Sequence, residues 1–414
     1  MSPAHRFDRA GADASALARV VGDLAHFRDA WGDRPWVHHG PGFGDLLDTA
    51  GIDELLTTRG LRTPFLRVAK NGSTLPERSF TAGGGVGAAV ADQISDARLA
   101  QHFADGATLV LQGLHRTWGP IIDFTADLAD ELGHPVQANA YVTPPRSQGF
   151  SAHYDVHDVF VLQLTGEKRW MIHEPVLTWP MRDETWESGG RRDQVGAAAQ
   201  GEPILDVVLR PGDCLYLPRG YLHSATALGG VSAHLTLGVH VWTRAHLAAE
   251  LMNRALADAA DLRRPLDVGV NVADPVQLAD DAAVVRRALL SALEQVSDAD
   301  LAGVMNDRAD ATARPAPVSP LAQAAAARDL TPDTPVRLRR HLRLRRSDES
   351  TGVRLRGRGI DLLVESSETR RLHLRLDLLL DGEAHTTREL AGATADDVLD
   401  LVRRLLEAGV LVPA

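Results

Sequence analysis

The chain has 414 residues, of which 44% are apolar and 24% are charged, a mixture that can bury a sizeable core and excludes a disordered protein. Its formal net charge of −11 argues against nucleic acid as a partner of the whole molecule. The single cysteine, Cys214, excludes an internal disulfide framework and favours a reducing, cytoplasmic setting. We find no secretory signal and no apolar run long enough to cross a bilayer, so no membrane association is expected.

Residues 1–242 have the pattern of a β-rich domain with helices at its N-terminal end. Apolar residues recur at helical spacing over 14–31, and a short strand with a turn is expected at 63–73. Further strands are expected at ATLVLQGL, VQANAYVTP, DVFVLQLTG, KRWMIHEP, ILDVVLRPGD and VSAHLTLGVHVW, with a helix at IIDFTADLADEL. This spacing predicts an α+β protein with a mainly β core, a double-stranded β-helix or jelly roll. The polar, Gly-rich segment 180–202 is expected to be a long loop.

Residues 243–320 are predicted to be helical. The segments RAHLAAELMNRALADAADLRRPL and DDAAVVRRALLSALEQV carry Ala and Leu on recurring faces. These faces are larger than one short hairpin needs, which predicts that the region joins two chains in a homodimer. The Pro-rich sequence ARPAPVSP follows as a linker.

Residues 321–414 are expected to form a winged-helix-like domain. Two strand-like pieces, GIDLLVES and LHLRLDLLLD (372–381), precede the helical pattern TADDVLDLVRRLLEAG and a final strand. Thr394 with Asp397 resembles a capping box, and Gly409 stands where the helix should end. The run VRLRRHLRLRRSDESTGVRLRGRG is locally basic, but the candidate recognition helix opens with two aspartates, which suit phosphate badly. Nucleic acid is therefore an unlikely partner.

The motif SAHYDVHD carries the strongest chemical signal in the chain. His153 and Asp155 are two residues apart, so on a β-strand both side chains would point to one face. A third ligand is expected at His223 in PGDCLYLPRGYLH, just past a strand that ends in a Pro-Arg-Gly turn. Two histidines and one carboxylate leave three positions of an octahedral ion open, the pattern of non-haem Fe(II) oxygenases. The open positions would accept 2-oxoglutarate and O₂, and no catalytic residue beyond the metal centre is expected.

Four other histidines lie in or beside strand-like segments, and each is interpreted as structural or as a neighbour of the site. His157 continues the face of the first two ligands but lies farther along the chain. His234 is the most informative, because it shares a strand face with Thr236 and would line the pocket. The four are His157, His173, His234 and His240.

Lys168 is the predicted partner of the cosubstrate. Lys168 and Trp170 share one face of the strand expected in TGEKRWMIHEP. A lysine on an apolar inward face needs an anion, which the distal carboxylate of 2-oxoglutarate would supply. In the alternative, Lys168 is solvated and Arg169 points inward. Asn139 and Tyr141, also two residues apart, would line the pocket from the neighbouring strand.

Together these motifs resemble the ribosomal oxygenase branch of the JmjC family of cupin proteins. NAYVTPPRSQGFSAHYDVHDVFVLQLTGEKRW and PGDCLYLPRGYLHSATALGGVSAHLTL are similar to the core of that family, over about residues 30–245, and the remainder is similar by architecture. The resemblance implies a JmjC/cupin catalytic domain that uses Fe(II), held by His153, Asp155 and His223, and 2-oxoglutarate, held by Lys168. We place Asn139, Tyr141 and Thr236 beside the cosubstrate, and Arg146, Gln148 and His234 beside the substrate.

The same resemblance implies hydroxylation of a histidyl or arginyl side chain on a ribosomal protein. Arg146 stands where bacterial arginyl hydroxylases tend to carry an acidic residue, and a basic residue there should repel an arginine substrate. The surrounding PPRSQGF is closer to the histidyl hydroxylases, which favours histidine, although Gly238 replaces the serine that often follows HLTL in that branch.

Three alternatives stay open. The oxygenase could act on another peptide or on a small metabolite. A cupin barrel could serve as an isomerase or binding protein with another metal, although Lys168 argues against this. The third alternative is a metal-binding, DNA-binding regulator. Ligand type alone does not fix the metal, since Mn, Ni or Zn accept the same three ligands.

Overall fold

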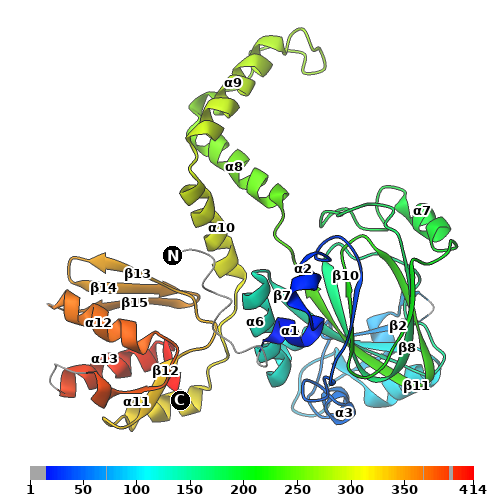
Figure 1. The fold of residues 1–414 in the computed structure, drawn as a ribbon, viewed down its shortest axis with the longest axis horizontal. Coiled ribbons are helices and arrows are strands. Elements are labelled where there is room, and N and C mark those ends of the chain that lie inside the picture. The colour runs from blue at the N-terminus through cyan, green and yellow to red at the C-terminus, as the bar shows by residue number, and fades with distance from the viewer. Residues whose placement is uncertain (1–14, 71, 367, 391–394) are drawn as a thin grey trace. The chain divides into compact units, whose positions relative to one another are not determined.

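A computed structural model describes residues 15–70, 72–366, 368–390 and 395–414. The chain divides into two compact units, Met1–Val241 and Trp242–Ala414 (Figure 1). In the described residues, no helix combines the length and apolar character that a membrane span requires. The division into three parts expected from the sequence stays a prediction.

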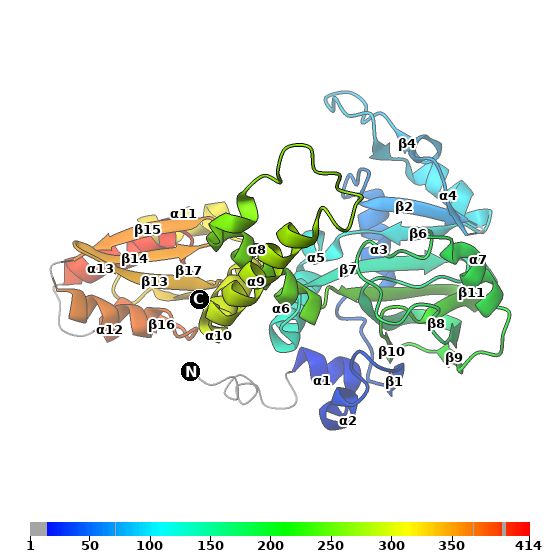
Figure 2. The ribbon, with the colours of Figure 1, turned by 90° about the horizontal axis from the view of Figure 1, so that it is seen from above.

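The first unit is built on a nine-stranded sheet, whose strands lie side by side in Figure 2. Its order is β1-β10-β8-β11-β7-β6-β2-β3, with β9 paired to β8, and every printed pairing is antiparallel. The strands are β1 (Trp36–His39), β2 (Leu66–Lys70), β3 (Ser73–Thr74), β6 (Thr108–Leu111), β7 (Val136–Thr143), β8 (Asp158–His173), β9 (Leu205–Leu209), β10 (Asp213–Leu217) and β11 (Leu222–Val239). Two short strands, β4 (Thr81–Ala82) and β5 (Gln93–Ile94), pair separately.

Two long bent strands give this sheet its jelly-roll form. The first half of β8 pairs with β10 and with the end of β11, whereas its second half pairs with β9 and with the start of β11. The sequence suggested two strands separated at Gly166, but the structure has one strand that bends there. Gly166 has φ +65, and a Cβ on it would lie 2.1 Å from the carbonyl oxygen of Val231. Glycine therefore allows the close approach of β8 and β11 at the bend.

One face of the nine-stranded sheet packs against the main apolar core, and the other face lines the interior of the barrel. Ala140, Leu162 and Leu235 belong to the main apolar core, which also includes side chains of α1 (Ala16–Val21) and α6 (Gly119–Leu132). The residues between them in sequence point to the opposite face, as strand alternation requires. That inner face carries most of the polar side chains described below. It also carries a smaller apolar cluster, which consists of Val159, Val161, Trp170, Ile172, Leu209, Leu215 and Leu217.

Residues 15–31 contain two short helices instead of one continuous helix. These are α1 and α2 (Leu24–Arg28). Gly22 ends the first with φ +69, and the side chain of Asp23 accepts the backbone N–H groups of Ala25 and His26 to cap the second. The other helices of the unit are α3 (Thr49–Thr57), α4 (Asp96–Ala104), α5 (Leu114–Thr117) and α7 (Arg191–Ala198), with a 3₁₀ turn at Glu77–Ser79.

The second unit begins with helices and continues as an α/β region. Its helices are α8 (Arg244–Asp258), α9 (Ala279–Gln295), α10 (Asp298–Thr312), α11 (Pro320–Arg328), α12 (Thr369–Leu379) and α13 (Ala395–Glu407), with 3₁₀ turns at Ala260–Arg263 and Thr387–Glu389. One sheet has the order β16-β12-β17 and another the order β13-β14-β15. These strands are β12 (Pro335–Leu338), β13 (Leu344–Glu349), β14 (Gly352–Gly357), β15 (Ile360–Glu365), β16 (His385–Thr386) and β17 (Leu411–Pro413).

The strand expected at 372–381 is wrong, because this segment forms most of α12. The alternation of Leu with polar residues suggested a strand, but Leu372, Leu376 and Leu379 are the buried residues while Leu374 is 66% exposed. Burial at these spacings follows the period of a helix and not the period of a strand.

The end of α13 agrees with the sequence prediction. Gly409 has φ +66, and its N–H donates to Leu406 O while the N–H of Val410 donates to Leu405 O, as in a glycine-terminated helix. The capping box assigned to Thr394 lies outside the described residues. The winged-helix and dimerisation assignments stay predictions.

Candidate metal centre

His153 and His223 meet through a pair of backbone hydrogen bonds. They form an isolated bridge, with His153 N 3.2 Å from His223 O and His223 N 2.8 Å from His153 O. Asp155 lies in an irregular segment before β8, where its carbonyl accepts the N–H of Gly220 at 3.1 Å. The expectation that the first two ligands share one strand face is therefore wrong. The three side chains converge because the backbone ties the segment 153–155 to the start of β11.

The three side chains form a compact donor set. One ligand atom from each of His153, Asp155 and His223 lies within 4.8 Å of the others, the one such cluster found among the described residues. Nε2 of His223 is 3.7 Å from Oδ2 of Asp155. Nδ1 of His153 is 2.8 Å from Ser151 O, and Nδ1 of His223 is 3.1 Å from Tyr221 O. A carbonyl only accepts, so both Nδ1 atoms carry the proton and both Nε2 atoms are left as metal donors.

Electrostatics keep this set in its metal-binding protonation state. Burial, together with the nearby His153, lowers the pKa of His223 to about 4. Burial alone would raise the pKa of Asp155, but the charges of His157, His223, His153 and Arg67 together lower it below its usual value. At neutral pH the site thus offers a neutral imidazole and a carboxylate. The donor set of two nitrogens and one oxygen fits a divalent transition metal with open positions.

Lys168 lies inside the barrel and is 4% exposed. Its Nζ donates to Thr143 Oγ1 at 3.1 Å, and within the described part of the chain no carboxylate pairs with it. Burial lowers its pKa to about 7. Arg169, by contrast, is half-exposed and pairs with Asp206, so the inward-pointing arginine of the alternative interpretation is not found. A buried cation without an anion marks a place where an anionic ligand would be stabilised.

Tyr141 and His234 form a stacked pair on the same inner face. Their ring centroids are 5.0 Å apart with planes 3° from parallel, and Trp170 packs edge-on against His234 at 5.4 Å. Burial raises the pKa of Tyr141 to about 12 and lowers that of His234 well below its usual value, so both are neutral. Nδ1 of His234 and Nε1 of Trp170 have no hydrogen-bond partner among the residues that the structure describes. They are polar atoms free to meet a ligand.

Asn139 and Thr236 are Cα partners across β7 and β11, two residues along from Tyr141 and His234. Oδ1 of Asn139 accepts the backbone N–H of Gly113 at 3.0 Å. This bond fixes the orientation of the amide and leaves its NH₂ group as the donor for the pocket. The structure therefore places both residues on the same inner face as the tyrosine–histidine pair.

Arg146 and Gln148 lie instead on the exposed loop between β7 and the metal ligands. Arg146 has φ +58, and Nε2 of Gln148 donates to Phe150 O at 2.8 Å. The structure does not bring either into the buried pocket, although the loop ends at Phe150, whose ring is 6.0 Å from that of His153.

The competing histidines lie outside the donor set. His157 has Nδ1 3.3 Å from Asp158 O and packs edge-on against His240 at 5.4 Å. Nε2 of His173 is 3.2 Å from Gly201 O. These contacts agree with structural roles.

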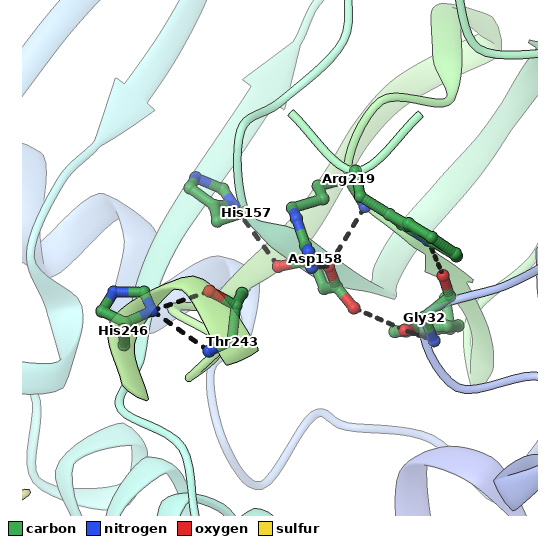
Figure 3. A network of polar contacts seen from close by, with 8 residues as sticks. Gly32, His157, Asp158, Arg219, Thr243 and His246 are labelled. Carbon is green, nitrogen blue, oxygen red and sulfur yellow. Dashed lines mark hydrogen bonds and ion pairs between the residues drawn. The ribbon is translucent and has the colours of Figure 1, made fainter. Parts of the chain in front are cut away.

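The sequence analysis missed Asp158, a buried carboxylate in the network of polar contacts drawn in Figure 3. Asp158 is 1% exposed; its Oδ2 accepts the hydroxyl of Tyr216 at 2.6 Å and its Oδ1 accepts the N–H of Arg219 at 3.1 Å. Tyr216 in turn accepts the N–H of Gly32 at 2.8 Å. Because Gly220 binds the carbonyl of Asp155, this network links the two ligand-bearing segments. Asp158 is the second aspartate of the motif SAHYDVHD, so the sequence could have pointed to it.

The segment 180–202 contains α7 and packs beside the metal ligands. Tyr154 donates its hydroxyl to Glu184 O at 2.8 Å, and its side chain forms a small apolar cluster with Val195 and Leu222. The ring of Trp186 lies 6.3 Å from that of His153. This segment therefore forms a wall of the site, and Trp186 is a second residue that sequence reasoning missed.

The fold is a jelly roll with a candidate metal site of two histidines and one aspartate. Residues 121–247 match the family model described as JmjC domain. The chain is 41% identical over 145 residues to the bifunctional lysine-specific demethylase and histidyl-hydroxylase NO66 of Drosophila persimilis, covering 33% of this chain and 20% of that protein. It is 42% identical over 118 residues to human ribosomal oxygenase 1, covering 28% of this chain and 18% of that protein. The chain thus aligns with about a fifth of the length of these curated relatives. The match covers the central part of the chain and makes that part similar to JmjC-domain proteins, ribosomal oxygenases among them.

A solved structure extends the likeness in fold. The Escherichia coli ribosomal oxygenase YcfD is similar over 95% of this chain and 98% of its own, with a TM-score of 0.50 and 18% sequence identity. At that identity the likeness shows the fold alone.

Proposed function

We propose that this protein is an Fe(II)- and 2-oxoglutarate-dependent oxygenase that hydroxylates an amino-acid side chain, histidyl in preference to arginyl, on a ribosomal protein. The observation that carries the proposal is the combination of a two-histidine, one-carboxylate donor set with a buried lysine that lacks an anionic partner among the described residues. The relatives named as oxygenases and histidyl-hydroxylases support the same reaction class.

His153, Asp155 and His223 would hold the iron through two imidazole nitrogens and one carboxylate oxygen. Bound iron with 2-oxoglutarate and O₂ supplies the oxidising power to hydroxylate an unactivated C–H bond, with succinate and CO₂ as coproducts. Lys168, assisted by the hydroxyl of Tyr141, would hold the distal carboxylate of the cosubstrate. The apolar side chains on the inner face exclude water from the site.

Aromatic rings beside the first ligand favour a flat substrate side chain. Phe150 and Trp186 lie 6.0 and 6.3 Å from the His153 ring, and Tyr141 lies 6.2 Å from Phe150. An imidazole can pack against such rings while its nitrogens meet polar groups. The exposed basic side chain of Arg146 disfavours a cationic substrate near the loop that it occupies.

We also propose that the protein is a homodimer joined through its helical region. No residue of α9 is buried, and Val284, Val285 and Leu290 on it are 38%, 41% and 64% exposed. Met252 and Leu256 of α8 are 41% and 44% exposed. Apolar surface of this kind is stabilised when a partner covers it. Light scattering at micromolar concentration tests the dimer, and a monomer would contradict it.

The test of the reaction is succinate release by iron-loaded enzyme with 2-oxoglutarate and O₂, with and without ribosomal proteins from the same organism. We expect release to rise with the ribosomal proteins and to vanish in Asp155→Ala. His240→Ala is the matched control, because this exposed histidine lies outside the donor set. If succinate release is the same with and without ribosomal proteins, the protein is still an oxygenase, but its substrate is another peptide or a small metabolite. No release with iron bound would favour a binding protein.

A further inference from the structure

Arg67 lies at the end of a row of side chains that crosses the sheet. On β2 it pairs with Val110 of β6, Val110 pairs with Tyr141 of β7, and Tyr141 pairs with His234 of β11. Cα partners on neighbouring antiparallel strands have their side chains on the same face. The guanidinium therefore belongs to the inner face that carries the metal centre and the stacked Tyr141–His234 pair.

The side chain of Arg67 is half-buried and has no hydrogen-bond or ion-pair partner among the described residues. Its Nε is buried without a hydrogen bond, and across the described ranges no carboxylate forms an ion pair with it. Its charge nevertheless reaches Tyr141, where it partly offsets the rise in pKa that burial causes. Other arginines on the same segment behave differently: Arg62 pairs with Asp92. An arginine left unpaired beside a metal centre needs an explanation other than folding.

The backbone fixes β2 beside the segment that leads to the first ligand. Gly72, at the turn after β2, donates its N–H to Gly149 O at 3.0 Å. A Cβ on Gly72 would lie 2.2 Å from the hydroxyl oxygen of Ser151. The β2–β3 hairpin is thus packed directly against residues 149–151, two residues before His153, and Arg67 stands on that side of the site.

Charge balance leaves Arg67 available for a substrate, on the condition that the proposed function holds. The charges of a divalent iron and of Lys168 are matched by Asp155 and the two carboxylates of 2-oxoglutarate. Arg67 is then a further positive charge on the inner face, without an ion-pair partner among the described residues. A guanidinium binds planar oxygen acceptors through two parallel N–H groups, which both neutralises and orients them.

We propose that Arg67 is a substrate-positioning residue that binds an oxygen acceptor, a backbone carbonyl or a carboxylate, of the protein segment that carries the reacting side chain. The contact holds the segment against the inner face so that the reacting carbon lies at the metal. Loss of a hydrogen bond to a charged group should weaken substrate binding by about tenfold to a hundredfold.

The experiment compares wild type, Arg67→Gln and Arg67→Lys, with Arg62→Gln as the matched control on the same segment. Ribosomal proteins from the same organism are the substrate probe. KM for these proteins is measured together with the dissociation constant of 2-oxoglutarate for the Mn(II)-loaded protein without O₂, the Mn(II) affinity and the Tm. We expect Arg67→Gln to raise KM about tenfold to a hundredfold, Arg67→Lys to recover part of the loss, and the other three quantities to match the control.

Four results would overturn the assignment, the first three of them with a wild-type enzyme that responds to ribosomal proteins. An unchanged KM removes the substrate contact. If Arg67→Gln raises the dissociation constant of 2-oxoglutarate as much as it raises KM, Arg67 binds the cosubstrate. If Arg67→Gln lowers the Mn(II) affinity, Arg67 stabilises the metal ligands. If ribosomal proteins do not raise succinate release by the wild-type enzyme, the proposed function is contradicted, and the assignment of Arg67 with it. An active wild type with an unaffected Arg67→Gln contradicts this assignment alone.

Discussion

Charged side chains behave in opposite ways in the barrel interior and in the C-terminal region. Lys168 is 4% exposed and has a hydroxyl as its hydrogen-bond acceptor. In the C-terminal region Arg388 is 68% exposed and pairs with Asp333 through two hydrogen bonds, at 2.7 and 2.8 Å. Arg346 pairs with Asp377 at 2.6 Å. The first arrangement is costly for folding, and the second costs little.

This difference distinguishes charged side chains that are available to bind a ligand from charged side chains that are paired at the protein surface. The run VRLRRHLRLRRSDESTGVRLRGRG is locally basic, and the sequence already made nucleic acid an unlikely partner. In the structure Arg345 and Arg354 pair with aspartates. Arg358 donates to the carbonyl oxygens of Ala311 and Ala313. Positive charges that are already paired within the protein are poorly placed to bind phosphate. Lys168 and Arg67 in the barrel have no carboxylate partner among the described residues and are therefore available to bind a ligand.

Removal of a ligand should give the largest effect. Asp155→Ala leaves two imidazoles and removes the carboxylate, so we expect metal affinity to fall by more than the 10–100-fold typical of residues that only support a ligand, and turnover to be lost. Titration with Mn(II) followed by electron paramagnetic resonance measures the affinity. Unchanged Mn(II) binding would mean that the metal sits elsewhere.

The cosubstrate lysine should come next. Lys168→Met keeps the side chain's length and removes its charge, and we expect the dissociation constant of 2-oxoglutarate to rise about a hundredfold with metal affinity unchanged. Calorimetry with Mn(II)-loaded protein measures both. Arg169→Met, one residue away and paired with Asp206 at the surface, should leave 2-oxoglutarate binding as it is. Equal effects of the two substitutions would contradict the assignment.

The support behind the ligands gives an intermediate effect. Asp158→Asn keeps the shape of the side chain but weakens its bonds to Tyr216 and Arg219, so we expect metal affinity to fall about 10–100-fold. Tyr216→Phe should show a smaller loss. Mn(II) affinity and Tm are compared in both variants. A lower Tm with full Mn(II) affinity would limit the network to folding.

The pH dependence of cosubstrate binding tests the buried lysine without a mutation. The pKa of Lys168 is lowered to about 7 in the free protein, and a bound carboxylate raises it again. Below pH 7 the lysine already carries its proton, so binding needs none. Above pH 7 binding must take up a proton, and affinity should fall by up to about tenfold per pH unit. Calorimetry in two buffers at pH 8 measures the uptake, which should vanish in Lys168→Met. No uptake in the wild type would mean that the lysine is charged before binding.

The exposed pairs should give the smallest effect. Arg388→Ala removes a surface ion pair with Asp333, and such pairs contribute little to stability. We expect turnover to be unchanged and the Tm to shift only slightly. A marked loss of turnover would show that the C-terminal region takes part in the reaction.

The sequence predicted that His153, Asp155 and His223 lie together, because HxD followed by PRGxxH has the spacing of a metal-binding motif. The structure brings the three side chains together, and metal binding stays a prediction. The sequence also predicted Lys168 inside because Trp170 shares its strand face. It mistook α12 for a strand, since alternating leucines in a short segment satisfy either period until burial decides. Arg67 and Asp158 escaped notice for a different reason. Their roles depend on which strands become neighbours, and a single sequence does not show that β2 joins β7 through β6.

The most direct test of the central claim is the ratio of succinate formed to oxygen incorporated into ribosomal protein by the iron-loaded wild type. Succinate is measured by chromatography and the incorporated oxygen by mass spectrometry of the intact proteins. We expect one hydroxylation for each succinate, on a single protein and on a histidine. Succinate without incorporated oxygen would contradict the claim that the unpaired charges of the barrel hold a cosubstrate and a ribosomal substrate together.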